Sequence, residues 1–262
     1  MTWIAHAGSP MLETVRAPAK LTVSLRITGT RSDGYHLIDS EMVTLDLADV
    51  LTIDPRGNGL TASGRFSSGL PLDHTNLVAK ALRLVDRTAG VHIDKQIPSG
   101  GGLGGGSADA AAVLRWAGFT DLDAASRLGA DVPFCLAGAT HDRSPAGEQI
   151  TPLDPVARDF TLVIPPLSCS TLAVYRAWDA LDRSQQTRPA DGPVNDLERA
   201  ALVVEPRLLE WRDRITEAAG VVPLLAGSGS TWFIDGHHSD IAEALASADV
   251  VLTSTSRGQT RR

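Results

Sequence analysis

Cysteine and long apolar runs are scarce in this 262-residue sequence, and each shortage excludes a class of protein. The two cysteines, Cys135 and Cys169, have no metal-ligand spacing and are too few for a disulfide framework, so we expect a cytoplasmic protein. No run of 18 apolar residues occurs, which predicts no membrane span. The net charge of −7 predicts no binding to nucleic acid or to an anionic membrane surface.

Lysine is also rare, with three residues (Lys20, Lys80 and Lys95) against 21 arginines. In a chain so biased toward arginine, a retained lysine points weakly to a need for its compact, mobile ammonium group. Lys80 fits an exposed helix face, whereas Lys20 and Lys95 lie beside the motifs described below.

Glycine is abundant in one segment, where ordering it is costly. Six of the seven residues at 100–106 are glycine, and glycine loses more backbone freedom on folding than any other residue. Such a loop can turn its amide N–H groups toward a ligand, and we expect Ser107 to cap a following helix whose N-terminus also attracts anions. A strand before the loop and a helix after it favour a phosphate-binding loop over a flexible linker.

Two familiar phosphate motifs fit this loop less well. Residues 100–105 match the dinucleotide fingerprint, and Asp121 lies about 20 residues further on. However, the preceding segment 91–97 alternates polar and apolar residues, whereas Rossmann strands are continuously apolar, so an oxidoreductase is the weaker alternative. The P-loop requires a lysine that this loop lacks. Phosphate charge must then be met by the backbone, the helix dipole, a metal and basic residues from elsewhere, with Lys20 and Lys95 as candidates.

The pattern along the chain predicts an α+β protein of two lobes. Apolar alternation at 21–27 and strand-like segments at 42–47 and 50–53 predict an antiparallel sheet in the first lobe. In the second lobe we expect strands at 160–164, 221–225, 231–234 and 250–254, with helices at 171–181, 206–219 and 239–246. The lobes span residues 1–158 and 159–262. Residues 1–11 lack the features of a secretory signal and are expected to form a disordered leader.

Residues 98–112 resemble the central signature of the GHMP kinases, and segments 17–21 and 227–231 resemble two further motifs in that family's order. Segments 29–36, 129–134 and 195–198 resemble, within the superfamily, the kinases that phosphorylate the 2-hydroxyl of a cytidine-diphosphate methylerythritol on the non-mevalonate route to isoprenoids. The resemblance covers about residues 15–234. It implies a mixed or antiparallel N-terminal sheet with helices and a ferredoxin-like C-terminal lobe. It also implies ATP and Mg²⁺ as cofactors, a small-molecule sugar alcohol as substrate, and a monomer or homodimer.

The resemblance implies that Lys20 and Asp131 are catalytic. Asp131 would act as the base or orient the acceptor hydroxyl, and Lys20 would pair with it. Taken without the resemblance, Asp131 would be a turn or cap aspartate and Lys20 a charge at a strand edge.

The resemblance assigns the ATP side to one continuous segment and two separate residues. The segment contacts the phosphates, with Ser107 near Mg²⁺, and consists of Pro98, Ser99, Gly100, Gly101, Gly102, Leu103, Gly104, Gly105, Gly106, Ser107 and Ala108. Lys95 and Asn76 would line the adenosine side. Asn76 fits a helix cap equally well.

The acceptor side is expected to recognise cytosine through aromatic stacking. Tyr35 and His36 resemble the base-recognition pair, and Tyr175, one helical turn after Thr171, resembles the second aromatic of a sandwich. A core position within its helix is the competing interpretation of Tyr175.

Two departures leave the acceptor open. Thr22 stands where the family usually has an asparagine that contacts substrate hydroxyls, and its hydroxyl reaches less far. The segment 107–129 is also shorter than usual. The alternatives are therefore a GHMP kinase for another alcohol, or a nucleotide-binding protein without activity.

Overall fold

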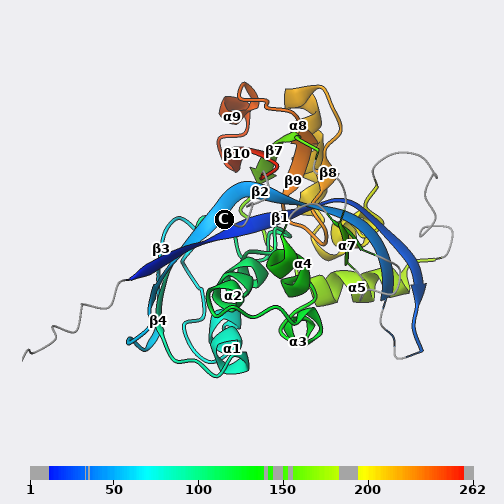
Figure 1. Cartoon of the computed structure of the whole chain (residues 1–262). Helices are drawn as coiled ribbons and strands as arrows, with labels where there is room; N and C mark the ends of the chain where they lie inside the picture. The colour runs from blue at the N-terminus through cyan, green and yellow to red at the C-terminus, as the bar shows by residue number, and fades with distance from the viewer. Residues whose placement is uncertain are drawn as a thin grey trace, which may run out of the picture.

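The computed structural model describes residues 12–32, 34, 36–138, 141–143, 150–152, 156–182 and 194–256. The expected leader, residues 1–11, lies outside these ranges. Two sheets and their helices form two lobes, and a long two-stranded ribbon runs across the molecule between them (Figure 1).

The ribbon consists of β1 (Glu13–Thr30) and β2 (His36–Asp54), which pair antiparallel. The sequence predicts shorter, separate strands here, because Pro18 and the polar residues near 46–49 interrupt the apolar pattern. The structure instead keeps both strands continuous through register shifts such as the one between Pro18 and Lys20. Residues on both faces of β1 are buried.

The first sheet has the strand order β3-β4-β2-β5-β6, and β1 pairs with β2 outside this order. The new strands are β3 (Gly59–Ser63), β4 (Gly90–Asp94), β5 (His141–Arg143) and β6 (Ile150–Pro152). In the described part of this sheet, β3 and β4 form the one parallel pair. Val91 and Ile93 of β4 are buried, and the three residues that alternate with them, Gly90, His92 and Asp94, are half-buried. A Rossmann sheet is parallel and buried on both faces, whereas this sheet is mainly antiparallel and β4 is half-buried on one side, which contradicts the Rossmann alternative.

The helices of the first lobe cover one side of the ribbon (Figure 1). They are α1 (Leu77–Leu84), α2 (Gly105–Trp116), α3 (Leu122–Ser126) and α4 (Val132–Ala137). The alanine-rich α2 is central, because its residues 110–114 are fully buried in a core shared with β2, β4 and α1. Small side chains let the backbone of α2 lie close to the sheet, which brings the preceding glycine loop against β1.

The second sheet has the antiparallel strand order β10-β7-β9-β8. Its strands are β7 (Asp159–Ile164), β8 (Leu224–Leu225), β9 (Trp232–Asp235) and β10 (Asp249–Ser254), and its helices are α5 (Thr171–Ala180), α7 (Glu198–Val204), α8 (Arg207–Ala219) and α9 (Ile241–Ala244). Numbering the strands along the chain gives the order 4-1-3-2 with helices in the crossovers. This is the predicted ferredoxin-like arrangement.

The two sheets share an apolar core. Leu21 and Leu45 of the ribbon pack with Phe160, Leu162 and Phe233 of the second sheet. The amide of Ser256 donates to the carbonyl of Thr44 at 2.8 Å, which ties the end of the described chain back to β2. The second sheet begins at Asp159, and a domain boundary at 158/159 remains a prediction.

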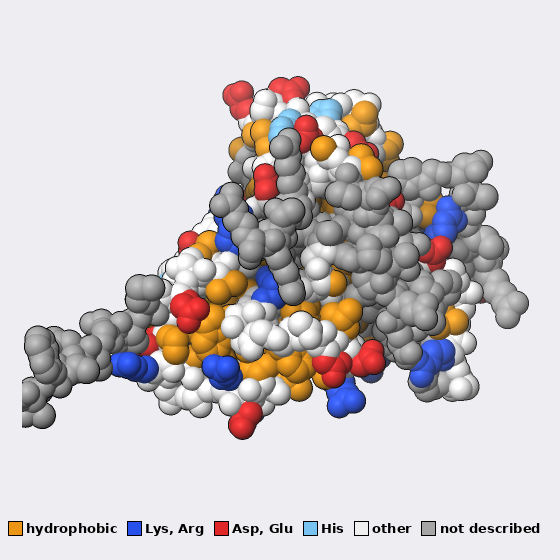
Figure 2. Space-filling view, in the orientation of Figure 1, with side chains coloured by type: hydrophobic (Ala, Val, Ile, Leu, Met, Phe, Trp, Pro, Cys, Tyr) orange, Lys and Arg blue, Asp and Glu red, His pale blue; other side chains and the backbone are white. Residues whose placement is uncertain are grey.

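The outer surface carries no obvious concentration of charge on the face drawn in Figure 2, where Lys and Arg side chains are scattered among Asp and Glu. Among the described helices, none combines the length and the apolar character needed to cross a membrane.

Candidate active site

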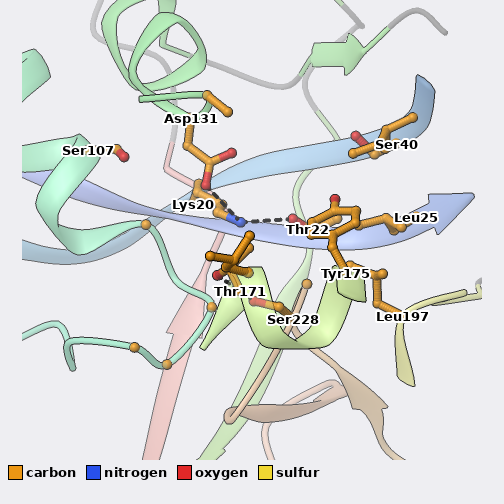
Figure 3. A pocket seen from close by; sticks show the side chains of 18 of the residues that line it. Lys20, Thr22, Leu25, Ser40, Ser107, Asp131, Thr171, Tyr175, Leu197 and Ser228 are labelled. Atoms are coloured by element: carbon orange, nitrogen blue, oxygen red, sulfur yellow. Dashed lines mark hydrogen bonds and ion pairs between the residues drawn. The ribbon is translucent and has the colours of Figure 1, made fainter. Parts of the chain in front are cut away.

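A cavity of about 680 Å³ opens where the two lobes meet, a size typical of small-molecule sites. Its walls come from β1, β2, the glycine loop, the start of α4, the helix α5 and the turn at 227–228 (Figure 3). Of the predicted site residues, the following line it: Lys20, Thr22, His36, Pro98, Ser99, Gly100, Gly101, Gly102, Gly104, Gly105, Gly106, Ser107, Asp131, Thr171 and Tyr175.

Lys20 and Asp131 meet in this cavity. The Nζ atom of Lys20 lies 3.4 Å from Oδ2 of Asp131 and donates a hydrogen bond to Oγ1 of Thr22 at 3.1 Å. Lys20 is 7% exposed at its side chain and Asp131 is 30% exposed, so the ammonium is confined while the carboxylate can reach a ligand (Figure 3). The pair is a fixed positive charge beside an accessible acceptor of protons.

The local fold explains why these two residues meet. Asp131 immediately precedes α4, and its carboxylate makes no capping bond to that helix. Arg115 of α2 donates to the carbonyl of Cys135 in α4 and, at 3.2 Å, to the carbonyl of Arg16 in β1. One half-buried guanidinium therefore joins the helix that follows Asp131 to the strand that presents Lys20.

The glycine loop is pressed against both lobes. Gly102 has φ +77°, and a Cβ atom there would overlap the carbonyl oxygen of Ala226. Gly104 has φ +68°, and a Cβ atom there would lie 2.7 Å from Cγ of Lys20. The carbonyl of Leu103 accepts from the amide of Lys20 at 3.1 Å. Glycine is required at these two positions because both the torsion angle and the close approach exclude a side chain.

The start of α2 differs from the prediction. The helix begins at Gly105, with Gly104 as its N-cap and no side-chain cap, so Ser107 is its third residue rather than the cap. This start favours anion binding. No side chain accepts from the first amide groups of the 12-residue helix, so these N–H groups are available to a ligand at the cavity wall. Two residues of the segment, Leu103 and Ala108, are fully buried and pack behind the loop.

Lys95 is predicted to line the adenosine side, but the structure places its side chain in the core beneath the loop. Its ammonium, 1% exposed, forms ion pairs with Asp49 and, at 2.6 Å, with Asp109 of α2. Asp49 also accepts from the amides of Gln96 and Ile97 at 2.6 and 2.8 Å. The Lys95 side chain thus ties the exit of β4 and the start of α2 to the sheet, and a contact of this residue with adenosine stays a prediction.

One carboxylate of this cluster is chemically unusual. Burial raises the pKa of Asp109 to about 7, against the lowering effect of Lys95, and the neighbouring Asp49 raises it further. Its Oδ1 atom has no hydrogen-bond partner in the described structure. A cluster of one ammonium and two carboxylates in the core would carry a net negative charge, which protonation of Asp109 removes.

Asn76 is the N-cap of α1. Its Oδ1 accepts from the amide of Val78 at 2.8 Å, its Nδ2 donates to the carbonyl of Pro71 at 2.7 Å, and it is 7% exposed. Asn76 does not line the cavity. Between its two predicted roles, the geometry favours the helix cap.

At the far end of the cavity, two rings meet. The His36 and Tyr175 ring centroids are 5.0 Å apart with the planes tilted by 32°, and Tyr175 projects from α5 toward Thr22 and Leu25 of β1 (Figure 3). Tyr175 is half-buried rather than a core residue. Tyr35 lies outside the described residues. The Oγ1 atom of Thr171 lies 2.9 Å from Oγ of Ser228 at the foot of the same helix.

Asp179 lines the cavity but was not among the predicted site residues. Its Oδ1 lies 2.7 Å from Nε2 of His36, which fixes the ring of a residue that is 9% exposed. Asp179 stands one helical turn after Tyr175, at the spacing that puts both on one helix face, and that spacing was the available signal.

The motif at 195–198 connects the 227–228 turn to β1 through hydrogen bonds. The side-chain Nδ2 of Asn195 donates to the carbonyls of Leu225 and Gly227 at 2.8 and 2.6 Å, and Oδ2 of Asp196 accepts from the backbone amide of Ile27 at 2.9 Å. These bonds hold the 227–228 turn beside β1. No role could be predicted for this motif from the sequence, because its partners lie between 30 and 169 residues away along the chain.

The described residues contain no group of three or more His, Cys, Asp or Glu that could hold a metal ion. The cavity offers oxygen donors instead, from Ser107 and Asp131. Burial raises the pKa of the Cys135 thiol to about 12, so this cysteine stays protonated and serves packing.

Residues 76–139 match the model of the GHMP kinases N terminal domain. The 4-diphosphocytidyl-2-C-methyl-D-erythritol kinase of Paracoccus denitrificans is 39% identical over 255 residues, covering 90% of this chain and 91% of that protein. The same kinase of Dinoroseobacter shibae is 36% identical over 265 residues, covering 90% and 89%. A crystal structure of 4-(cytidine 5'-diphospho)-2C-methyl-D-erythritol kinase superposes with a TM-score of 0.75 at 32% identity, covering 93% of this chain and 100% of that one.

Proposed function

The chain belongs to the GHMP kinases, among the 4-diphosphocytidyl-2-C-methyl-D-erythritol kinases, and we propose that Lys20 and Asp131 are its catalytic residues. It is an ATP-dependent kinase that phosphorylates the 2-hydroxyl of 4-diphosphocytidyl-2-C-methyl-D-erythritol in isoprenoid precursor synthesis. The observation that carries the catalytic assignment is the 3.4 Å approach of Lys20 to Asp131 beside the glycine loop.

The glycine loop binds the ATP phosphates in this proposal. Its backbone N–H groups and the N-terminus of α2 supply partial positive charge, as the absence of a lysine in the loop requires. The N-terminus of α2, the loop and Ser107 all line the same wall of the cavity. This arrangement holds the γ-phosphate near Lys20, whose stem packs on Gly104.

Asp131 receives the proton of the acceptor hydroxyl. As the acceptor oxygen forms its bond to the γ-phosphorus, the bond from that phosphorus to the β–γ bridging oxygen breaks and ADP leaves. The hydroxyl proton passes to Oδ2 of Asp131. Lys20 keeps a positive charge beside both the carboxylate and the phosphoryl group, in a water-poor position where it costs little reorganisation.

The donor set of the cavity fits Mg²⁺ that arrives with ATP. This ion prefers oxygen ligands and is commonly held by phosphates, waters and one or two protein oxygens. The Ser107 hydroxyl and the Asp131 carboxylate are the protein oxygens in position, and the described residues offer no larger cluster. When bound, the ion neutralises charge that develops on the phosphates.

The acceptor end is proposed to lie along α5. Tyr175 stacks on cytosine, His36 contacts its polar edge, and Thr22 and Thr171 face the sugar alcohol. The Thr22 hydroxyl already accepts from Lys20, so its contact with the substrate hydroxyls is made beside the reacting group.

The test is turnover by the purified chain. With ATP, Mg²⁺ and 4-diphosphocytidyl-2-C-methyl-D-erythritol we expect ADP and an acceptor heavier by one phosphoryl group, measured by mass spectrometry. Homoserine and phosphomevalonate serve as matched acceptors without a cytidine group. Turnover of one of these, with none of the cytidine compound, would contradict the assignment.

A further inference from the structure

We infer that Arg176 binds the diphosphate of the acceptor, an inference that rests on the proposed function. Nothing in the family resemblance or in the predicted site includes this residue. The ligand class is a nucleoside diphosphate ester whose base end lies at Tyr175 and whose reactive end lies at Asp131.

The helix α5 presents a stripe of side chains to the cavity. Leu172, Tyr175, Arg176 and Asp179 all line it, at spacings of three and four residues that align side chains on a helix. Arg176 stands one helical turn after Leu172 and about one turn before Asp179, so it lies at the level of the Tyr175 ring along the cavity side of the helix. In a cytidine diphosphate ester the phosphates come next after the base and its ribose, so a phosphate-binding group is needed beside the stacking ring.

Charge in the cavity points to the same residue. The described residues that line the cavity include one lysine, Lys20, and one arginine, Arg176. Lys20 is engaged by Asp131 and Thr22 at the transfer point. The acidic side chain nearest along α5, Asp179, is engaged by His36. Arg176 is thus the cation left to balance two phosphate charges in a chain of net charge −7.

Arg176 also differs from other arginines of its lobe. Arg207 and Arg212 each form an ion pair with a carboxylate. Arg176 forms none within the part of the chain that the structure describes, and it is exposed at the cavity rim. A planar guanidinium that is not paired within the protein matches two phosphate oxygens in a bidentate manner.

The test compares cytidine with cytidine diphosphate as ligands of the wild-type chain and of Arg176→Gln. Binding is measured by calorimetry with the ATP site saturated by a non-hydrolysable ATP analogue. We expect Arg176→Gln to weaken the diphosphate by about three- to tenfold, the range for a charge-assisted contact at an exposed site, and to leave cytidine unchanged. Arg176→Lys keeps the positive charge, so it should weaken the binding of cytidine diphosphate less than Arg176→Gln does. In turnover, Arg176→Gln should raise KM for the acceptor and leave KM for ATP unchanged.

Arg127→Gln is the matched control, because it removes the same charge at an exposed position just after α3, outside the cavity. An equal loss for cytidine and its diphosphate, no loss for either, or a raised KM for ATP would overturn the inference. A wild-type chain that binds neither ligand and turns over no cytidine acceptor would overturn the proposed function as well. Normal wild-type turnover with an unaltered Arg176→Gln would overturn the role of Arg176 alone.

Discussion

Two of the three lysines are buried against carboxylates, and the two differ in whether the carboxylate can be reached from solvent. Lys20 faces a cavity and pairs with a carboxylate that is 30% exposed. Lys95 is enclosed with Asp49 and Asp109, whose side chains are 0% and 3% exposed. An accessible pair can exchange protons with a substrate, whereas an enclosed cluster can act only on the backbone it holds. At the scale of residues, solvent access separates the proposed catalytic lysine from the structural one.

The enclosed cluster makes stability depend on pH. Burial raises the pKa of Asp109 from 3.8 to about 7 in the folded chain. Between these two values the folded chain holds a proton that the unfolded chain has released, so stability is highest below pH 3.8 for this group and falls as pH rises toward 7. Asp109→Asn, which mimics the protonated form, should remove this part of the slope.

The measurement is the thermal midpoint of wild type and Asp109→Asn from pH 5 to 8. The exposed Asp123→Asn serves as control and should keep the wild-type slope. Identical slopes in Asp109→Asn and wild type would show that Asp109 is ionised throughout.

At the scale of elements, the cap of α1 separates the two interpretations of Asn76. Asn76→Ser keeps an oxygen that can cap the helix, whereas Asn76→Ala removes it, at a typical cost of about 1 kcal/mol in unfolding free energy. We expect Ala to destabilise more than Ser in urea unfolding, and both variants to keep the wild-type KM for ATP. A raised KM in Asn76→Ser with normal stability would instead place Asn76 against the nucleotide.

Elements with local signals could be predicted from the sequence. The helices α5 and α8 carry apolar periodicity and a capping residue or a terminal glycine, and their predicted bounds agree with the structure within one residue. The short helices α4 and α7 lack such periodicity and were missed, although α4 directly follows Asp131. The unbroken β1 and β2 could not be predicted either, because their continuity depends on pairing between distant residues.

The same distinction applies to the site. Motif order brought Lys20, Asp131, His36 and Tyr175 into one prediction, and the structure places all four around one cavity. The position of the Lys95 side chain and the pairing of Asp179 with His36 depend on three-dimensional packing. No spacing along the chain encodes these contacts.

At the scale of the whole molecule, neither lobe contains a complete site. The glycine loop comes from the first lobe, while α5 and the 227–228 turn come from the second, and Gly102 touches Ala226 across the junction. Gly102→Ala should separate these surfaces, raise KM for ATP and destabilise the chain. Gly69→Ala is the matched control, since Gly69 has nearly the same φ of +74°, but a Cβ atom there would have no atom of the described residues within 4 Å.

Both alanine variants bear the cost of a positive φ, of order 1 kcal/mol, so the difference between them measures the contact at the junction alone. Equal melting temperatures and equal KM values would show that the loop does not depend on the second lobe. Assembly as a monomer or homodimer stays a prediction.

The central claim is that Lys20 and Asp131 perform the phosphoryl transfer, while the glycine loop only binds ATP. The kinetics of Asp131→Asn test this claim most directly. Loss of a positioned base typically costs about 10²–10⁴ in rate, so kcat should fall by that factor while ATP affinity, measured by calorimetry, stays at the wild-type value. Asp123→Asn should retain full activity. A wild-type kcat in Asp131→Asn, or a loss explained by weaker ATP binding, would contradict the account.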